Sequence, residues 1–498
     1  MKKIPYILIF ALTLCGCEDF LDARPEATTD VQGTDYTKSE NIFLPVSAAY
    51  ASLRSNNMHG FSYIGMFEIV GDDADKGSTA SDNPPMADVD NFAVTPTNTL
   101  LNDFWVGCYD AVSAANFAVG EMPKFEEALL NAENKQYARE CRAEARVIRA
   151  YAYFMLARAF GRVYLADRVY SSDELSSLPQ ASVKQVYELI ERDLDSAISV
   201  LPESYGKEWA GRLSRYSALA LKAKVHLHQP DADFPHRWDS VATCAGKVIA
   251  SRRYSLMSSY RDVFRSQGEN GSESLLEIQS STLGRTTGEA TYLEYAFYQG
   301  PRGNKPTNMQ GWGFCVPSQK LRDFLALRGD TQRAEVLLMP AGTTYEGSPI
   351  LAIEGNPPYY NGKVFSPPSE NKWSYNGYGF DYNVRVLRYA DVLLMYAEAL
   401  ARGATPYAGA GTADEALHQV RSRVGLADVA TTTENILDER RAELALEQDR
   451  YFDLIRQGEA AATAAFAGTG FSYAKHRVFP IPSNQRQLNS NLEQNPLY

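Results

Sequence analysis

The stretch 140–160, ECRAEARVIRAYAYFMLARAF, carries the strongest constraint on the fold, because its apolar residues follow the period of an α-helix. They recur at steps of four and three residues, at Cys141, Ala145, Ile148, Ala152, Met155 and Ala159. Such spacing places them on one helix face, which other elements must cover. Small residues nearby, such as Ala143, Ala150 and Ala157, allow neighbouring helices to approach closely. The sequence therefore predicts a mainly α-helical protein.

The same period predicts further helices in the first half of the chain. They lie at 183–201, 215–228 and 238–251. The segment AYAYF, residues 150–154, fits the A-x3-F element of tetratricopeptide helices, although no strict 34-residue self-similarity is visible. We therefore interpret residues 41–267 as degenerate helical hairpins of the tetratricopeptide type.

Residues 268–385 interrupt this pattern. They are rich in Gly, Pro, Asn, Ser and Tyr, and they contain turn dipeptides such as Asn-Gly and Asn-Pro. A long non-periodic segment inside a compact protein is usually functional. Helices are predicted to resume over 386–460, and Gly403 is placed to end the first of them. The second part of the chain, 268–498, thus combines a large irregular insertion with helices.

The N-terminus predicts export and lipidation. Lys2 and Lys3 precede an apolar run to Leu14, a run too short to span a bilayer but typical of a signal peptide. The following Leu-Cys-Gly-Cys resembles a bacterial lipobox with Cys17 as the acceptor, whereas Cys15 directly follows the bulky Leu14 and fits worse. We predict a signal peptide over 1–16, lipidation of Cys17 and a tether over 17–40, with the protein anchored to a membrane through its acyl chains.

Composition and motifs exclude several functions. The formal charge of −12 argues against nucleic-acid binding, which needs clustered Lys and Arg. No P-loop, GxGxxG, HExxH or GxSxG motif occurs, and we predict no cofactor or metal. The segment DDADKGSTASDN, 72–83, lacks the EF-hand glycine and final glutamate, so we interpret it as a solvated acidic loop. Four dispersed cysteines remain after Cys17, and their spacing does not determine a disulfide, so that question stays open.

One acidic row, a row of glutamates, could have either a catalytic or a structural role. In ERRAELALEQDRYFDLIRQGEA, which begins at Glu439, glutamates also stand at 443 and 447. A glycosidase needs two carboxyl groups on opposite sides of a bond, and one helix face offers only one side. We predict ion pairs instead, from Glu443 to Arg440 and from Glu447 to Arg450, because residues three apart are neighbours on a helix. These ion pairs would lower the pKa values of the glutamates. The glutamates would then stay ionised and could not act as a general acid.

Several stretches together resemble one known family in its own order. They are CEDFLD at the lipobox, FWVGCYDAVSAAN (104–116), RAYAYFMLARAFGRVYL (149–165), RYADVLLMYAEALAR, VRSRVGL, the acidic row and VFPIPSNQRQLNSNLEQNPLY. The chain resembles the SusD/RagB family, outer-membrane nutrient-binding lipoproteins of Bacteroidetes, over essentially its whole length. A Gly-Tyr end is usual in that family, and here Leu497-Tyr498 stands in its place.

The resemblance implies a SusD-like fold and a protein that binds without cleaving. Such a protein would capture glycan at the cell surface and deliver it to a SusC-like TonB-dependent transporter. Capture of peptides or glycopeptides by the same scaffold is the alternative. A lipid-anchored glycoside hydrolase is disfavoured, because no carboxylate pair has a two-sided setting.

Ligand contacts are predicted in two segments, 72–104 and 285–314, because binding residues favour loops on a rigid scaffold. Three tyrosines at three-residue spacing would share one face of a short helix, and Trp312 stands between two glycines that leave its ring free to project. The resemblance places ligand-contacting loops at these two positions but carries over no individual residue. The candidate residues are Asp75, Asn91, Tyr292, Tyr295, Tyr298, Arg302 and Trp312.

Overall fold

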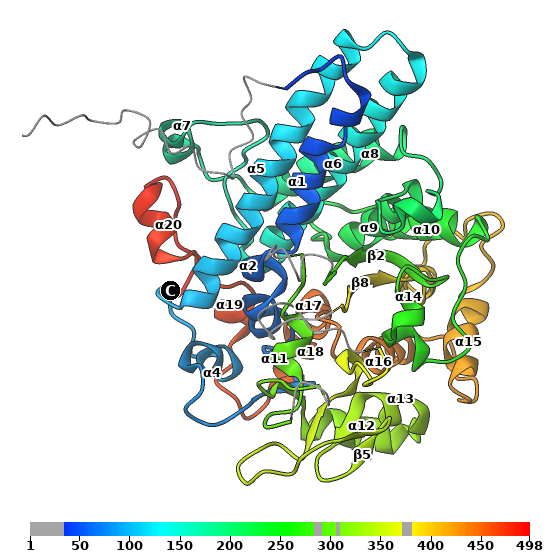
Figure 1. The fold of residues 1–498 in the computed structure, drawn as a ribbon. Coiled ribbons are helices and arrows are strands. Elements are labelled where there is room, and N and C mark those ends of the chain that lie inside the picture. The colour runs from blue at the N-terminus through cyan, green and yellow to red at the C-terminus, as the bar shows by residue number, and fades with distance from the viewer. Residues whose placement is uncertain (1–33, 283–290, 305–308, 371–380) are drawn as a thin grey trace, which may run out of the picture.

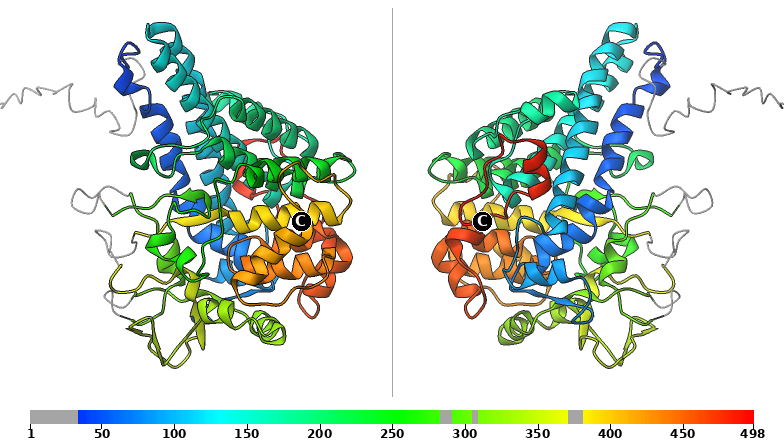
Figure 2. Two further views of the ribbon diagram at one scale, coloured as in Figure 1. Left: turned by 90° about the vertical axis from the view of Figure 1, so that its right-hand side faces the viewer. Right: turned by 90° about the vertical axis from the view of Figure 1, so that its left-hand side faces the viewer.

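The computed structural model describes residues 34–282, 291–304, 309–370 and 381–498. It is mainly α-helical, as predicted, and two long antiparallel helices dominate it, α5 (Thr99–Ala128) and α6 (Ala132–Phe160). Asn131 caps α6 by accepting a hydrogen bond of 2.7 Å from the Glu133 amide. Both side views show this pair rising beyond the rest of the molecule (Figure 2).

The predicted face of α6 is fully buried, but it is not the only buried face. Cys141, Ala145, Ile148, Ala152 and Met155 are all inaccessible to solvent, which confirms the helical period. From position 147 onward every residue to Phe160 is buried, because α5, α8 and α9 pack around this helix. A pattern of one apolar face was therefore too narrow a description of a helix that becomes the centre of the scaffold.

The helices predicted at 183–201, 215–228 and 238–251 form close to those positions, and further short helices join them. Ser182 and Ser214 form capping boxes that begin α8 and α9. The helices are α1 (Leu44–Leu53), α2 (Asn56–His59), α3 (Phe61–Tyr63), the π-helix η3 (Ile64–Ile69), α4 (Pro84–Asp90), α7 (Ser172–Ser177), α8 (Val183–Ile198), α9 (Arg215–His228) and α10 (Arg237–Ala250).

The irregular segment contains more helix than its composition predicts. Only α11 (Tyr295–Gln299) was expected there, whereas α12 (Gln319–Arg328) and α13 (Thr331–Leu337) also form. Ser318 and Asp330 cap these two helices. Short antiparallel strand pairs fill much of the remainder: β1 (Ala74–Gly77) with β3 (Phe314–Pro317), β2 (Ser274–Ile278) with β8 (Val384–Arg388), β4 (Leu338–Pro340) with β7 (Tyr359–Asn361), and β5 (Thr344–Tyr345) with β6 (Ser348–Pro349).

Helices resume after β8, as expected. Gly403 follows the first of them with a φ of +94°, the left-handed geometry that suits glycine at a helix end. The helices are α14 (Tyr389–Ala401), α15 (Ala413–Arg423), α16 (Thr433–Leu444), α17 (Arg450–Arg456), α18 (Glu459–Ala465), α19 (Tyr473–His476) and α20 (Ser483–Leu488). Figure 1 shows these late elements, in yellow to red, packed beside and beneath the earlier helices.

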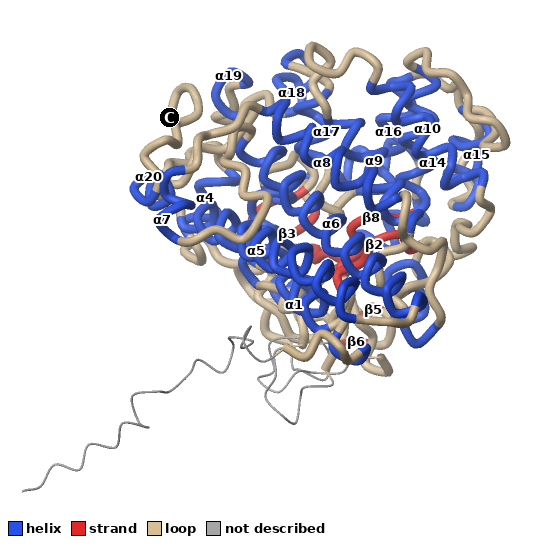
Figure 3. Tube along the Cα trace, turned by 90° about the horizontal axis from the view of Figure 1, so that it is seen from above, coloured by secondary structure: helices blue, strands red, loops and turns tan. Residues whose placement is uncertain are grey.

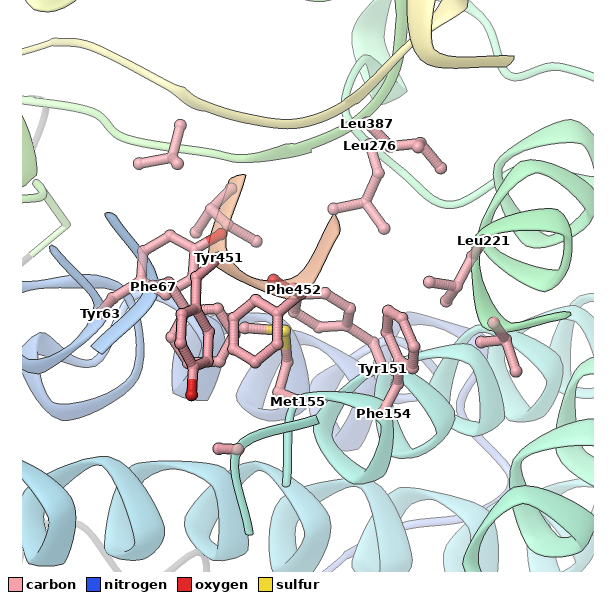
Figure 4. Packing of buried hydrophobic residues seen from close by; sticks show 14 of the residues in the cluster. Tyr63, Phe67, Tyr151, Phe154, Met155, Leu221, Leu276, Leu387, Tyr451 and Phe452 are labelled. Atoms are coloured by element: carbon pink, nitrogen blue, oxygen red, sulfur yellow. The ribbon is translucent and has the colours of Figure 1, made fainter. Parts of the chain in front are cut away.

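One hydrophobic core joins the two parts of the sequence. The ring of Phe67 in η3 lies 4.7 Å from that of Phe452 in α17 and 5.0 Å from that of Phe104 in α5. Figure 4 shows Tyr151 and Leu276 in the same cluster, and Figure 3 shows β2, β3 and β8 inside a shell of helices. Each fully buried large apolar side chain contributes about 1.5–3 kcal/mol of stability. The scaffold that carries the loops is therefore continuous and rigid.

Candidate functional site

Strand pairing brings the two predicted ligand-binding segments together. Gly77 of β1 lies opposite Phe314 of β3, and the Ser78 amide donates a 2.6 Å hydrogen bond to the carbonyl of Gly313. Gly77 has a φ of +68°, and a Cβ atom on it would lie 2.4 Å from the Gly313 oxygen. Only glycine fits at this crossing. Residues some 240 positions apart thus form one surface, a juxtaposition that the sequence analysis did not predict.

A half-exposed tryptophan is the main feature of this surface. Trp312 keeps 41% of its surface accessible, and its ring lies 5.0 Å from Tyr298, 5.5 Å from Phe297 and 6.0 Å from Phe61. The surrounding rings fix its orientation, so it presents a preformed flat apolar face. A pocket of about 570 Å³ opens beside it, lined by Phe61, Asp82, Asn83, Arg302, Gly303, Gln310, Gly311, Trp312 and Phe314.

A charged pair forms the polar side of this pocket. The Arg302 guanidinium pairs with the Asp82 carboxylate and donates a 2.7 Å hydrogen bond to Ser78 Oγ. The hydrogen bond from Ser78, together with Arg302, holds the pKa of Asp82 below its ordinary value. Asp82 is therefore an ionised carboxylate at neutral pH, and both side chains remain partly accessible. An aromatic plane beside a donor and an acceptor suits a ligand with flat apolar faces and hydroxyl groups.

A small polar cluster supports the aromatic plane from α2. Asn56 Nδ2 donates to the Tyr298 hydroxyl at 2.6 Å and to Glu294 Oε2 at 3.0 Å, and the Tyr298 hydroxyl donates to Glu294. Burial, reinforced by Glu294, raises the pKa of Tyr298, which stays neutral. Tyr298 is only 3% exposed, so its role is to position Trp312.

The remaining candidate residues do not line this pocket. Asp75 and Asn91 are exposed, and the Asn91 side chain donates to the Ala87 carbonyl at the end of α4. The predicted stripe of three tyrosines is wrong, because α11 begins at Tyr295 and Tyr292 precedes it. Tyr295 points into the core, where Gln448 Nε2 donates to its hydroxyl.

Sequence reasoning did not single out Phe61, Asn56 or Asp82 as contributors to this site. Asp82 lay inside a segment that was named, but its role depends on Arg302, 220 residues away. Phe61 and Asn56 belong to a helical region that carries no binding signal. Their position beside Trp312 arises only from the packing of α2 and α3 against α11 and β3.

We expect Tyr295→Phe to lower the free energy of unfolding by about 1–3 kcal/mol and to leave ligand binding unchanged. The substitution removes the hydroxyl that accepts from Gln448 and leaves a buried amide without that partner. Urea unfolding and calorimetric titration would measure the two effects. Weakened binding at unchanged stability would instead place Tyr295 in contact with the ligand.

The acidic row is structural, as predicted, but its partners are different. Glu443 is inaccessible to solvent and pairs with Arg333 at 2.9 Å, with Arg388 at 3.0 Å and with Arg423. Glu439 binds Arg328, Arg333 and Arg421, and Glu447 binds Lys363 and Arg388. The predicted pairs within the row do not form, because the long side chains point away from α16 into neighbouring elements.

The two arginines of those predicted pairs bind other acids. Arg440 pairs with Asp391 at 2.5 Å and with Asp453 at 3.2 Å, and Arg450 pairs with Asp72 at 2.7 Å. Asp72 and Asp73, expected in a solvated loop, are thus buried against Arg441 and Arg450. That expectation was wrong for the first two acids of the segment, since they anchor β1 to the scaffold.

The described part of the chain holds no cluster of three or more metal-ligating side chains. Its cysteines, Cys108, Cys141, Cys244 and Cys315, are free and buried. Cys17 lies outside the described residues. Among the helices of the described ranges, none has the length and apolar content to cross a bilayer.

Helical hairpins that carry a preformed aromatic pocket on paired loops define a ligand-binding scaffold protein. The profile described as "SusD family" matches residues 352–498, and the one described as "Starch-binding associating with outer membrane" matches residues 19–227. The chain belongs to the SusD family.

Individual relatives are similar in sequence over nearly the whole of this chain. A SusD-like protein of Bacteroides ovatus is 26% identical, covering 91% of this chain and 82% of the relative. SusD-like protein P2 of Formosa agariphila is 27% identical, covering 99% and 98%.

Solved structures show the same fold. A laminarin-binding SusD-like protein is similar with a TM-score of 0.78 and 26% identity, over 92% of this chain and 99% of that one. Surface glycan-binding protein A from Bacteroides thetaiotaomicron is similar with a TM-score of 0.77 and 24% identity, over 93% and 100%. The predicted SusD-like fold is therefore confirmed.

Proposed function

We propose that this protein captures glycan at the cell surface and delivers it to a SusC-like TonB-dependent outer-membrane transporter. The observation that carries the proposal is the half-exposed ring of Trp312, held rigidly beside the Arg302–Asp82 pair. An aromatic ring can stack on the apolar face of a sugar while charged groups bind its hydroxyls. The laminarin-binding relative, at 26% identity, supports this class of ligand.

The proposal includes binding without cleavage. Glu439 and Glu443 are inaccessible and saturated by arginines, so no substrate can reach the acidic row. In the pocket, Asp82 is an ionised carboxylate paired with Arg302, and among the described residues no second carboxylate lines the pocket opposite it. A glycosidase needs two carboxyl groups on either side of the bond.

Calorimetric titration of the full chain tests the proposal. A panel would contain laminarihexaose, other neutral oligosaccharides, acidic oligosaccharides and peptides of similar length. Saturable binding of an oligosaccharide without release of products supports glycan capture. Binding of peptides alone would favour the alternative, peptide capture by the same scaffold, and hydrolysis of a bound glycan would contradict both.

Lipidation of Cys17 is part of the same proposal. Several acyl chains on one cysteine would anchor the protein stably, since each buried methylene contributes about 0.8 kcal/mol. We expect Cys17→Ala to move the protein from the outer-membrane fraction to the soluble fraction. Cys15→Ala is the matched control and should leave it in the membrane. Retention of the Cys17→Ala protein, with no acyl adduct by mass spectrometry, would contradict the assignment.

A stable transporter partner is the second expectation. Helical-repeat scaffolds offer extended surfaces for protein contacts. Affinity purification from native membranes in mild detergent should recover a TonB-dependent receptor at a ratio near one to one. Repeated recovery of the protein alone, while its glycan binding is intact, would contradict the transporter part of the proposal and leave the capture part standing.

A further inference from the structure

A second pocket, of about 430 Å³, lies between α1, α6 and β2. Its walls are mainly apolar, and the strand side includes Leu276 and Ile278. This pocket lies beside α1, at one end of the segment 44–63. The other end of that segment supplies Phe61 to the Trp312 pocket. Figure 1 shows α2 between α1 above and α11 below, so α2 connects the two places on one side of the molecule.

One arginine that lines the pocket has no ion-pair partner among the residues that the structure describes. Arg54 ends α1, and its Nε atom is buried with no hydrogen bond. No carboxylate of the described chain lies within 4 Å of its guanidinium, whereas Arg302 pairs with Asp82 and Arg212 pairs with Glu144. Burial lowers the pKa of Arg54, and no neighbouring acid counteracts it. A partly desolvated, unpaired cation is costly, and an anion from outside the chain would remove the cost.

The two acidic residues that line the pocket, Glu277 and Glu208, do not pair with Arg54. Glu277 Oε2 accepts hydrogen bonds from the Asn270 amide at 3.1 Å and from Asn383 Nδ2 at 2.9 Å. Glu208 is exposed, and its carboxylate lies against Gly206. The pocket therefore offers one unengaged cation among apolar walls.

An exposed aromatic ring stands in the same pocket. Trp209 is 41% exposed, and its ring lies 5.4 Å from Phe43 and 5.0 Å from the Arg212 guanidinium. Glu144 pairs with Arg212, whose guanidinium lies over the Trp209 ring. This cation–π contact fixes the orientation of the ring. The combination of a fixed, accessible aromatic ring and an arginine repeats the chemistry of the Trp312 pocket, except that here the arginine is unpaired.

We propose that this pocket is a second sugar subsite, which takes a carboxylate- or sulfate-bearing residue of the captured glycan. Arg54 binds the anionic group, and Trp209 contacts the sugar ring. This inference rests on the proposed glycan capture and adds a ligand class, acidic polysaccharides, to it. An arginine fork matches both anions, because each presents two oxygens to its N–H groups.

The test compares Arg54→Met with Trp312→Ala in calorimetric titrations of the full chain. Two acidic probes, oligogalacturonate and a sulfated oligosaccharide, distinguish carboxylate from sulfate, and laminarihexaose is the neutral probe. Arg54→Met should weaken binding of one acidic probe by about tenfold to a hundredfold, the usual effect of losing a charged hydrogen bond. It should leave neutral glycan binding unchanged and the melting temperature nearly unchanged, since the Nε atom of Arg54 makes no hydrogen bond that would be lost and methionine keeps an apolar stem of similar length.

Arg477→Met is the charge-matched control, because Arg477 is exposed and lies outside the pocket. It should bind the acidic probe normally. If Arg54→Met binds both acidic probes as the unmodified protein does, or if neither acidic probe binds while neutral glycans do, the subsite is refuted and glycan capture stands. Dependence on Arg54 for acidic peptides alone would also refute it. If no oligosaccharide binds at all, glycan capture itself fails.

Discussion

Glu443→Gln should lower the free energy of unfolding by about 3–5 kcal/mol, the usual cost of removing one partner from a buried ion pair. The carboxylate is inaccessible to solvent and neutralises parts of Arg333, Arg388 and Arg423. The amide leaves these buried cations with too little negative charge, and part of the cost comes from their mutual repulsion. Urea unfolding, followed by circular dichroism, measures the change.

Glu434→Gln is the matched control in the same helix. Glu434 lies in the exposed first turn of α16, so its substitution should change stability by no more than about 0.5 kcal/mol. Equal stability of the two variants would show that the acidic row is not structural. Loss of a hydrolytic activity in a folded Glu443→Gln protein would restore the catalytic interpretation.

The ion pairs of Glu443 also determine whether stability rises or falls with pH. Burial by itself would raise the pKa of Glu443, but Arg423, Arg333 and Arg388 lower it below its ordinary value. A carboxyl group with a lowered pKa in the folded state contributes stability above its unfolded pKa and loses it as the pH falls. Stability should therefore decrease below about pH 4 to 5, less steeply in Glu443→Gln.

Trp312→Ala should weaken binding of the glycan ligand by at least about tenfold, because a central aromatic anchor typically contributes about 2 kcal/mol or more. The ring is 41% exposed and is held by Tyr298, Phe297 and Phe61, so ligand contact requires no rearrangement. The melting temperature should fall by only a few degrees, since much of the ring already faces water. Calorimetric titration and thermal unfolding measure the two quantities.

Trp312→Phe keeps an aromatic face and should retain part of the affinity. Leu327→Ala removes another exposed apolar side chain, 90% accessible and outside the pocket, and should have no effect on binding. Normal binding by Trp312→Ala would place the glycan site elsewhere. Early melting of Trp312→Ala would assign the ring to the core instead.

Much of the scaffold could be predicted because helical order is encoded locally. The limits of α9, Arg215–His228, follow from the apolar period and from a serine cap at the preceding position. Gly403 ends α14 because its φ of +94° is strained for other residues. Trp312 could be identified because flanking glycines and an irregular context mark an exposed ring. Each of these signals lies within a few residues of the position that it concerns.

Long-range partners are decided by the path of the chain, which no local pattern contains. Glu443 has Arg440 three residues away, yet it pairs with Arg333, 110 residues away, because packing of α13 beside α16 buries both side chains together. Arg302 likewise meets Asp82 only because β1 pairs with β3. The sequence by itself determined helices on both sides of the irregular segment and one exposed aromatic residue. The tertiary structure decided which charges meet and which residues surround that ring, since both depend on contacts between segments that are distant along the chain.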